Sequence, residues 1–269
     1  MKKHPIKLLL AGTCLATTLL LAGGAVAKDQ PAPPSASAST PAPLTKDAQA
    51  LALLKGMSET LAKAPTLSFR ARGLVPFLAP TGQYVSLFAD SSVLLQRPDK
   101  LLVKSRGDLF PNDLYYDGKT VTAIGVDQHF YAQQPAKGKG LEAILHEAQP
   151  GSDSLAPFID LLGPDSYAGL SVGVTSAVWV GRSKIDGTDT DHLAFIAKDV
   201  DWEIWIGTAD KLPRLMVVAY REGKRQPTFT VQFSEWKPDA PVSADTFTAL
   251  IPKDATKIKF KPLGAEPSK

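Results

Sequence analysis

The sequence has 269 residues, with 30 Lys and Arg against 27 Asp and Glu and a formal net charge of +3. Its first 27 residues hold three of the lysines and no acid, so the remainder is balanced at 27 basic and 27 acidic residues. That balance excludes the basic excess on which nucleic-acid binding depends. The one cysteine, Cys14, also lies in this first segment, so we expect no disulfide framework in the rest of the chain.

Residues 1–27 have the three parts of a secretory signal peptide. Lysines precede an apolar stretch at 8–21, and the small residues Ala25 and Ala27 occupy the third and first positions before Lys28. An uncleaved membrane anchor is the alternative, but the stretch is shorter than the about 20 apolar residues that span a bilayer. A lipoprotein site at Cys14 fits poorly because a threonine directly precedes it. We expect cleavage between Ala27 and Lys28, a periplasmic location, and a mature form that does not span the membrane.

Residues 28–46 are mostly Pro, Ala, Ser and Thr. A segment of this composition buries too little apolar surface to offset the entropy lost on ordering, so it predicts a disordered linker. The folded domain is expected over residues 47–262, and residues 263–269 are expected to form a flexible tail.

The folded part opens with a helix and then changes its periodicity. Apolar residues at positions 50, 53, 54, 57 and 61 form one helical stripe, with Thr45 as the expected N-cap and Pro65 as the stop. After Pro65 the apolar period becomes two, and Asp117-Gly118-Lys119 predicts the turn of a hairpin. The strands are expected at residues 83–97, 100–106, 114–117, 120–126, 129–134, 177–185, 192–196, 200–206, 215–220 and 228–236.

Two short helices interrupt these strands. One is expected at 141–148, and the other begins at Asp153 or Ser154 and ends before Gly163. Runs of strands with few helices between them are typical of an antiparallel sheet and argue against a doubly wound α/β fold. The predicted fold class is therefore mainly β (α+β), with one large, mostly antiparallel sheet and a few helices packed on one side.

Two residue clusters raise the question of catalysis or metal binding. Residues 169–173 match the GxSxG pattern, but a nucleophile elbow needs a strand before it and a helix after it, and the residues that follow Ser171 indicate strand or loop. Asp186, Asp189, Asp191 and His192 are potential metal ligands, yet they match no complete calcium loop and indicate a solvated turn. We therefore expect no catalytic residues, no metal and no cofactor, with a hydrolase using Ser171 and His192 as the alternative.

The strongest binding signal is a set of alternating apolar residues in two late strands. In residues 201–206 the period of two places both Trp202 and Ile204 on one face and Trp205 on the other. The set is either ordinary sheet core or the lining of an apolar ligand cavity. The residues expected to line such a cavity are Trp202, Ile204, Ile206, Phe229, Val231 and Phe233.

The C-terminal half contains a set of specific segments, mainly within 186–258: residues 201–206, Leu212-Pro213-Arg214, Pro227-Thr228-Phe229, Trp236 and Ile251-Pro252. In these segments the chain resembles an uncharacterised family of predicted periplasmic proteins. That family is similar in turn to the LolA/LolB/RseB-like superfamily of envelope proteins. The resemblance implies an unclosed β-barrel, which is a strongly curved antiparallel sheet with short helices on its concave face. It brings no catalytic residues with it.

The function implied by this resemblance is binding. We expect a non-enzymatic periplasmic protein whose concave face takes an apolar, lipid-like or lipoprotein ligand, so its partner is a lipid, an acylated lipoprotein or an envelope protein. The alternative is an envelope interaction or sensor module of the RseB type. Nucleic acid is not expected as a partner, because the charge balance and the predicted compartment both argue against it.

Overall fold

The computed structural model describes residues 44–108, 110–137, 140–141, 144, 157–221 and 226–259. The predicted signal peptide with its Ala27–Lys28 cleavage site, most of the predicted linker and the C-terminal tail lie outside these residues. So does most of the helix expected at 141–148. The described residues therefore do not test these predictions.

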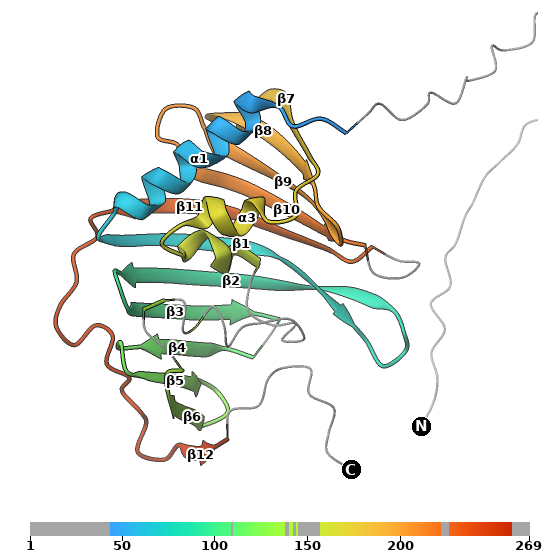
Figure 1. Ribbon diagram of the computed structural model, residues 1–269. Coiled ribbons are helices and arrows are strands. Elements are labelled where there is room, and N and C mark those ends of the chain that lie inside the picture. Colours follow the sequence, from blue (N-terminus) through green and yellow to red (C-terminus); the bar gives the residue numbers. More distant parts are fainter. Residues whose placement is uncertain are drawn as a thin grey trace, which may run out of the picture. The chain divides into compact units, whose positions relative to one another are not determined.

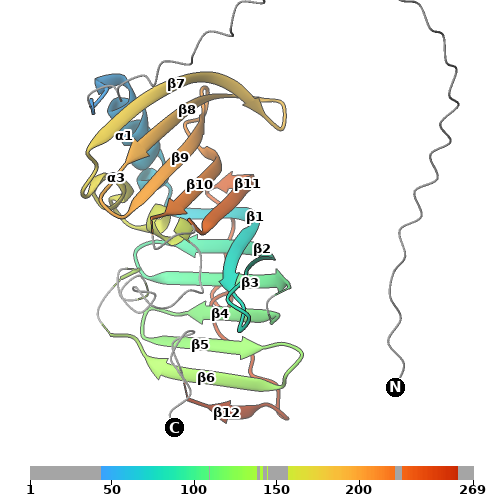
Figure 2. The ribbon, with the colours of Figure 1, turned by 90° about the vertical axis from the view of Figure 1, so that its right-hand side faces the viewer.

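The described residues form one sheet of twelve strands, whose order is β12-β6-β5-β4-β3-β2-β1-β11-β10-β9-β8-β7. Neighbouring strands are antiparallel except β12 and β6, which are parallel. The first and last strands of this order do not pair, so the sheet is curved but unclosed (Figures 1 and 2). The strands are β1 (Thr66–Leu78), β2 (Tyr84–Gln96), β3 (Lys100–Gly107), β4 (Asn112–Tyr116), β5 (Thr120–Gly125), β6 (Phe130–Pro135), β7 (Ser176–Ile185), β8 (Thr188–Ile196), β9 (Val200–Gly207), β10 (Pro213–Tyr220), β11 (Thr228–Pro238) and β12 (Thr256–Ile258).

The predicted fold class and the ten predicted strands are therefore confirmed, with ends that shift by a few residues. The hairpin around Gly118 forms as expected. The carboxylate of Asp117 accepts hydrogen bonds from the backbone N–H groups of Lys119 (2.9 Å) and Thr120 (2.8 Å), which fixes the turn between β4 and β5. Strands β1 and β12 were not predicted. Gly73 and Pro76, which are uncommon inside strands, interrupt β1, and the three exposed residues of β12 carry no alternation.

Helix α1 (Ala48–Lys63) buries its predicted apolar stripe against the sheet. The expected N-cap at Thr45 is wrong, because the side chain of Asp47 accepts the hydrogen bond from the N–H of Gln49 (2.8 Å). The carbonyl of Thr45 instead accepts from the N–H of Ala177 in β7 (2.9 Å), so the chain enters α1 from the edge of the sheet. Lys46 forms a parallel bridge with the same residue of β7.

Two further helical segments lie beside α1. The second predicted short helix is a 3₁₀ helix in the described residues, η1 (Pro157–Leu162), and it is followed by α3 (Ser166–Ser171). Helix α3 was not predicted. It begins at Asp165, whose carboxylate accepts from the N–H of Ala168 (2.9 Å), and α1 contacts both segments. We call α1, η1 and α3 together the helix cover (Figure 1).

The helix cover divides the sheet into two unlike faces. The helix-covered face carries the alternating buried residues of the strands, and the opposite face, which we call the open face, carries the polar ones. No helix within the described ranges is long and apolar enough to cross a bilayer.

Candidate functional site

All six residues expected to line an apolar cavity lie on the helix-covered face. Three come from β9 and three from β11, and each side chain is at most 5 % exposed: Trp202, Ile204, Ile206, Phe229, Val231 and Phe233. They belong to one continuous apolar cluster that also includes Leu54, Met57 and Leu61 of α1. In this structure the surface of the sheet and the helix cover are therefore packed against each other.

An aromatic cluster lies at the centre of this layer. Phe69 of β1 stacks on Trp236 (ring centroids 4.4 Å apart), and its edge contacts with Phe158 of η1 and Phe233 of β11 have centroid separations of 6.0 Å. Phe158 also makes an edge contact with Phe233 at 6.0 Å. Edge-to-face and offset geometries are the favourable ones for aromatic rings, so this cluster joins η1 firmly to the middle of the sheet.

A β-bulge in β11 brings Trp236 into the cluster. The register of β1 against β11 shifts between Ser68 and Arg70, and Glu235 has a φ of 56°. The extra residue reverses the alternation of β11, so Trp236 follows Phe233 onto the helix-covered face while Glu235 stays exposed. The indole N–H of Trp236 donates to the carbonyl of Pro213 (2.9 Å).

Arg97, at the end of β2, joins the sheet to the helix cover. Its Nη1 donates to the carbonyl of Leu162 in η1 (3.1 Å), and its Nη2 donates to the carbonyl of Leu61 in α1 (3.0 Å). Burial lowers the pKa of Arg97, and its Nε is buried without a hydrogen-bond partner among the described residues. Within the helix cover, α3 is joined to α1 by a hydrogen bond from the backbone N–H of Tyr167 to the hydroxyl of Ser58 (2.9 Å).

The two residues of the alternative hydrolase are not placed together. Ser171 is the last residue of α3, and the chain runs from it towards β7, which is the reverse of the strand-to-helix order of a nucleophile elbow. His192 faces the open side of the sheet, because its neighbour Leu193 is buried under the helices. Its ring stacks on Trp205 (centroids 3.9 Å apart), and its Nε2 lies 2.6 Å from a carboxylate oxygen of Glu203.

The acidic cluster does not form the solvated turn that we expected. The turn itself contains Asp186, but Asp189 and Asp191 belong to β8. Asp191 is 4 % exposed and accepts from the indole N–H of Trp179 (3.1 Å), so it completes a buried contact between β7 and β8. Across the described part of the chain, no three His, Cys, Asp or Glu side chains are grouped so that they could hold a metal ion.

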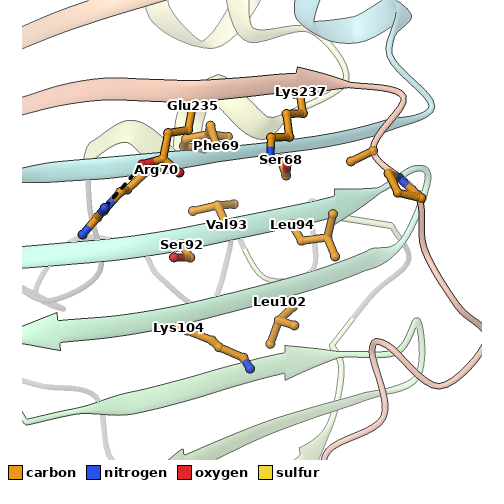
Figure 3. Close-up of a pocket in the computed structure, with 12 residues that line it drawn as sticks. Ser68, Phe69, Arg70, Ser92, Val93, Leu94, Leu102, Lys104, Glu235 and Lys237 are labelled. Carbon is orange, nitrogen blue, oxygen red and sulfur yellow. Dashed lines mark hydrogen bonds and ion pairs between the residues drawn. The ribbon is translucent and has the colours of Figure 1, made fainter.

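The open face has a depression with a volume of about 380 Å³ across β11, β1, β2 and β3 (Figure 3). None of the six predicted lining residues contributes to it. Figure 3 shows Lys104 and Lys237 on opposite sides of the depression, and neither has an ion pair with any other described residue. The lining residues are Ser68, Phe69, Arg70, Ser92, Val93, Leu94, Leu102, Lys104, Glu235, Lys237, Ala240 and Pro241.

Arg70 organises the charges at one end of this depression. Its guanidinium contacts both carboxylate oxygens of Asp90 (2.8 and 2.6 Å), and its Nη1 reaches Glu235 at 3.3 Å. The hydrogen bonds from Arg70 hold the pKa of Asp90 below its usual value. Because the ionised form of Asp90 is favoured in the native state, this contribution to stability is present above pH ~4 and is lost as the pH falls through the lowered pKa.

Replacing Arg70 should therefore change how the free energy of unfolding depends on pH under acidic conditions. In Arg70→Gln the pKa of Asp90 rises, and the free energy of unfolding falls less steeply as the pH is lowered from about 4. Carboxyl-carbon NMR titration of Asp90, combined with urea unfolding at several pH values, measures both changes. Arg221→Gln is the matched control, because it removes the exposed ion pair with Asp201. An Asp90 titration that is the same in Arg70→Gln and in the wild type would contradict this prediction.

Sequence reasoning missed Arg97, Arg70 and Phe69. Arg97 is the last residue of the strand expected at 83–97, and we assigned it no role from the sequence. A lone arginine at the end of an apolar strand was the available signal, since an arginine in that place needs carbonyl or carboxylate acceptors. The partners of Arg70 lie 20 and 165 positions away, so no local pattern identifies them.

Comparisons with known proteins identify the family of the chain. The model of a family described as predicted periplasmic protein (DUF2092) matches residues 50–261. No curated protein sequence matches the chain.

Several solved structures are similar to the chain at low identity. Lipoprotein LppX of Mycobacterium tuberculosis is 13% identical, with 74% of this chain and 100% of that chain covered and a TM-score of 0.42. The MucA/MucB complex of Pseudomonas aeruginosa gives 13% identity, coverage of 75% and 61%, and a TM-score of 0.42. A LolA superfamily protein from Nitrosomonas europaea gives 12%, coverage of 74% and 97%, and a TM-score of 0.33.

The family match covers most of the chain and nearly all of the described sheet, from α1 to beyond β12. It includes the segment 186–258, on which the sequence resemblance mainly depended. The chain belongs to the DUF2092 family of predicted periplasmic proteins.

Proposed function

We propose that this protein is a non-enzymatic binding protein of the cell envelope that takes an apolar chain, from a lipid or an acylated protein, between its helix cover and its sheet. The observation that carries the proposal is the covered apolar layer itself. Large aromatic and aliphatic side chains occupy the face of a curved, unclosed sheet, and the three helical segments of the helix cover pack over them. Trp202, Phe229 and Phe233 are among the side chains that the ligand would contact.

Binding at this place requires the cover to move, because its side chains fill the layer. Moving η1 exposes Phe158, Leu161 and Leu162, which are all at most 6 % exposed. Exposing each such side chain costs about 1.5–3 kcal/mol, and burying one methylene of a ligand recovers about 0.8 kcal/mol. A saturated chain of about 16 carbons therefore offsets the exposure of all three side chains, whereas a chain of about four carbons does not. The proposal thus favours long acyl chains over short ones.

A reversible disulfide between α1 and α3 tests this proposal, because η1 continues into α3, and tying α3 to α1 hinders the movement of η1 away from the sheet. Ser58 and Tyr167 are in contact across α1 and α3, and the chain that begins at Lys28 contains no cysteine. We expect the variant Ser58→Cys/Tyr167→Cys, oxidised to a disulfide, to bind a fluorescent 16-carbon fatty acid at least tenfold more weakly than the same variant after reduction. Fluorescence titration measures the affinity, and intact mass verifies both the disulfide and the N-terminal residue.

The two single variants, Ser58→Cys and Tyr167→Cys, are the matched controls and should keep the affinity of the wild-type protein. Protein exported and purified from the periplasm should also carry a co-purifying amphiphile in native mass spectrometry. Equal binding in the oxidised and reduced double variant would contradict entry of the ligand by movement of η1 and α3 away from α1. If no amphiphile co-purifies and the wild-type protein does not bind the probe, the binding function itself is wrong.

The depression on the open face favours a second function, which is docking of an acidic segment of an envelope protein. Lys104 and Lys237 present two cations on opposite sides of one hollow, with the apolar side chains of Leu94 and Leu102 between them. A photo-crosslinker at Ser92 should then capture a protein in cells, and Lys104→Glu/Lys237→Glu should abolish the capture. Capture that is unchanged in the Lys→Glu variant would contradict this function without affecting the first.

A further inference from the structure

The hairpin of β1 and β2 extends well beyond the rest of the sheet. The pairing of β1 with β11 ends at Leu74, and the pairing of β2 with β3 begins at Ala89. Residues 75–87 therefore pair only with each other, as a two-stranded ribbon that projects from the sheet (Figures 1 and 2). We call residues 74–88 the hairpin arm.

Both faces of the hairpin arm carry large apolar side chains, and the exposed polar residue within its paired strands is Ser86, opposite Pro76. The sequence has no charged residue between Arg72 and Asp90. On one face of the ribbon Leu74 pairs with Phe88 and Leu78 pairs with Tyr84, and on the other face Phe77 pairs with Val85. Leu74, Phe77 and Leu78 are 46 %, 47 % and 55 % exposed, so both faces present large apolar side chains to the surroundings.

The exposed apolar side chains of this ribbon do not contribute to the core of the domain. A two-stranded hairpin without further strands is at best marginally stable in water, and exposed apolar surface is typical of an interaction site. A ribbon that lies on the surface of a partner protein needs one apolar face and keeps the other polar. Apolar side chains on both faces indicate a ribbon that enters an apolar medium.

The backbone of the arm is also suited to such a medium. At the tip the N–H of Ala79 donates to the carbonyl of Gln83, and the N–H of Gly82 donates to the carbonyl of Ala79, both at 2.8 Å. Because the N–H of Ala79 points towards β2, the alternation of hydrogen bonds along β1 points the backbone nitrogen of residue 76 away from β2. Residue 76 is a proline, so it has no N–H to leave unpaired on that outer edge. Fewer free donors on the outer edge lower the cost of leaving water.

Charges appear only at the base of the arm, where three arginines and three aspartates balance: Arg70, Arg72, Arg106, Asp90, Asp108 and Asp113. Asp90 is held by Arg70, Arg106 is paired with Asp113 at 2.8 Å, and the carboxylate of Asp108 accepts from the N–H of Phe88 (2.8 Å). The base therefore offers little net charge to an acidic surface. Attraction between the arm and a partner has to come from apolar contact.

We propose that the hairpin arm inserts into the interfacial region of a lipid bilayer and holds the domain at a membrane surface. Four residues of a strand beyond the sheet span roughly 13 Å, which is less than half of the about 30 Å hydrocarbon core of a bilayer. The arm thus reaches the headgroup and upper acyl region of one leaflet without crossing it. The proposal does not depend on ligand binding under the helix cover, because the arm lies outside the covered layer.

Flotation with vesicles tests the proposal directly. We expect the protein purified from the periplasm to float with neutral phosphatidylcholine vesicles, and Phe77→Ser/Leu78→Ser to bind them about tenfold more weakly. The control variant Val172→Ser/Leu250→Ser removes two residues that are 74 % and 84 % exposed outside the arm and should bind as the wild type does. Because the base is neutral, binding should change less than twofold when the ionic strength rises from about 0.05 to about 0.5 M.

A label on the arm gives a second measurement that does not depend on the double variant. An environment-sensitive dye attached to Leu78→Cys should shift its emission to the blue on addition of vesicles, whereas the same dye at Leu250→Cys should not. Absence of flotation by the wild-type protein would overturn the proposal, as would equal flotation of the Phe77→Ser/Leu78→Ser variant. Arm-dependent dimerisation without flotation, measured by light scattering, would also overturn it in favour of a protein partner.

Discussion

Phe233→Ala is expected to lower the free energy of unfolding by about 3–5 kcal/mol. The side chain of Phe233 is 1 % exposed and contacts the rings of Phe69, Phe158 and Trp236, so its removal leaves a cavity between β11 and η1. The neighbouring rings come from three different elements, and the sheet cannot collapse onto the space without breaking its register. Urea unfolding followed by tryptophan fluorescence should show the midpoint falling by at least about 1 M.

Phe110→Ala is the matched control for this substitution. Phe110 is 73 % exposed, so its removal should change the free energy of unfolding by less than about 0.5 kcal/mol. A loss of stability for Phe233→Ala no greater than that of the control would mean that the layer under the helices is loosely packed. The account of the covered face as a filled core would then be wrong.

Arg97→Ala is expected to lower the free energy of unfolding by about 2 kcal/mol, because two helix carbonyls lose a charged donor. The loss is smaller than the sum of two charge-assisted hydrogen bonds, since burying the guanidinium already carries a cost, visible in the lowered pKa of Arg97. The same variant should bind the fluorescent fatty acid at a higher rate, because η1 and α1 are no longer held to the end of β2. Stopped-flow fluorescence measures this rate.

Measuring both the stability and the binding rate of Arg97→Ala tells whether Arg97 holds the helix cover in place or only stabilises the domain in general. Arg221→Ala removes an exposed ion pair with Asp201 at the end of β10 and should change stability by less than about 1 kcal/mol with no change in the rate of binding. A slower or unchanged association rate in Arg97→Ala would contradict the role of Arg97 in holding the cover closed.

Much of the architecture could be predicted from the sequence, because alternation and helical spacing are local properties. The stripe of α1 and ten of the twelve strands were predicted within a few residues, and the Asp117-Gly118 turn formed as expected. The N-cap was placed wrongly because Thr45 and Asp47 are both good caps, and the choice depends on the pairing of this segment with Ala177. Helix α3 was missed because its short sequence has low helical preference and owes its position to Asp165 and Ser58.

The sites were less predictable than the fold. The six residues of β9 and β11 were assigned to one face by their period, but no period tells whether that face is empty or filled by helices. The answer depends on Phe158 and Leu161, which are distant from them in the sequence. The depression on the open face requires the bulge at Glu235, and a bulge depends on the register between two strands that only the folded chain defines.

The position of β1 in the sheet has a consequence for how the chain acquires its structure. One edge of β1 pairs with β2, which follows directly, whereas the other edge pairs with β11, and the contact between Arg70 and Glu235 joins residues 165 positions apart. Strands β1 to β6 can form early as a meander of neighbours, but β1 keeps an unpaired edge until β11 is available. Pairings of such long range are intrinsically slow. During synthesis from the N-terminus, β1 therefore keeps an unpaired, aggregation-prone edge until β11 has been made. Pairing of β11 with β1 is the step that covers this edge.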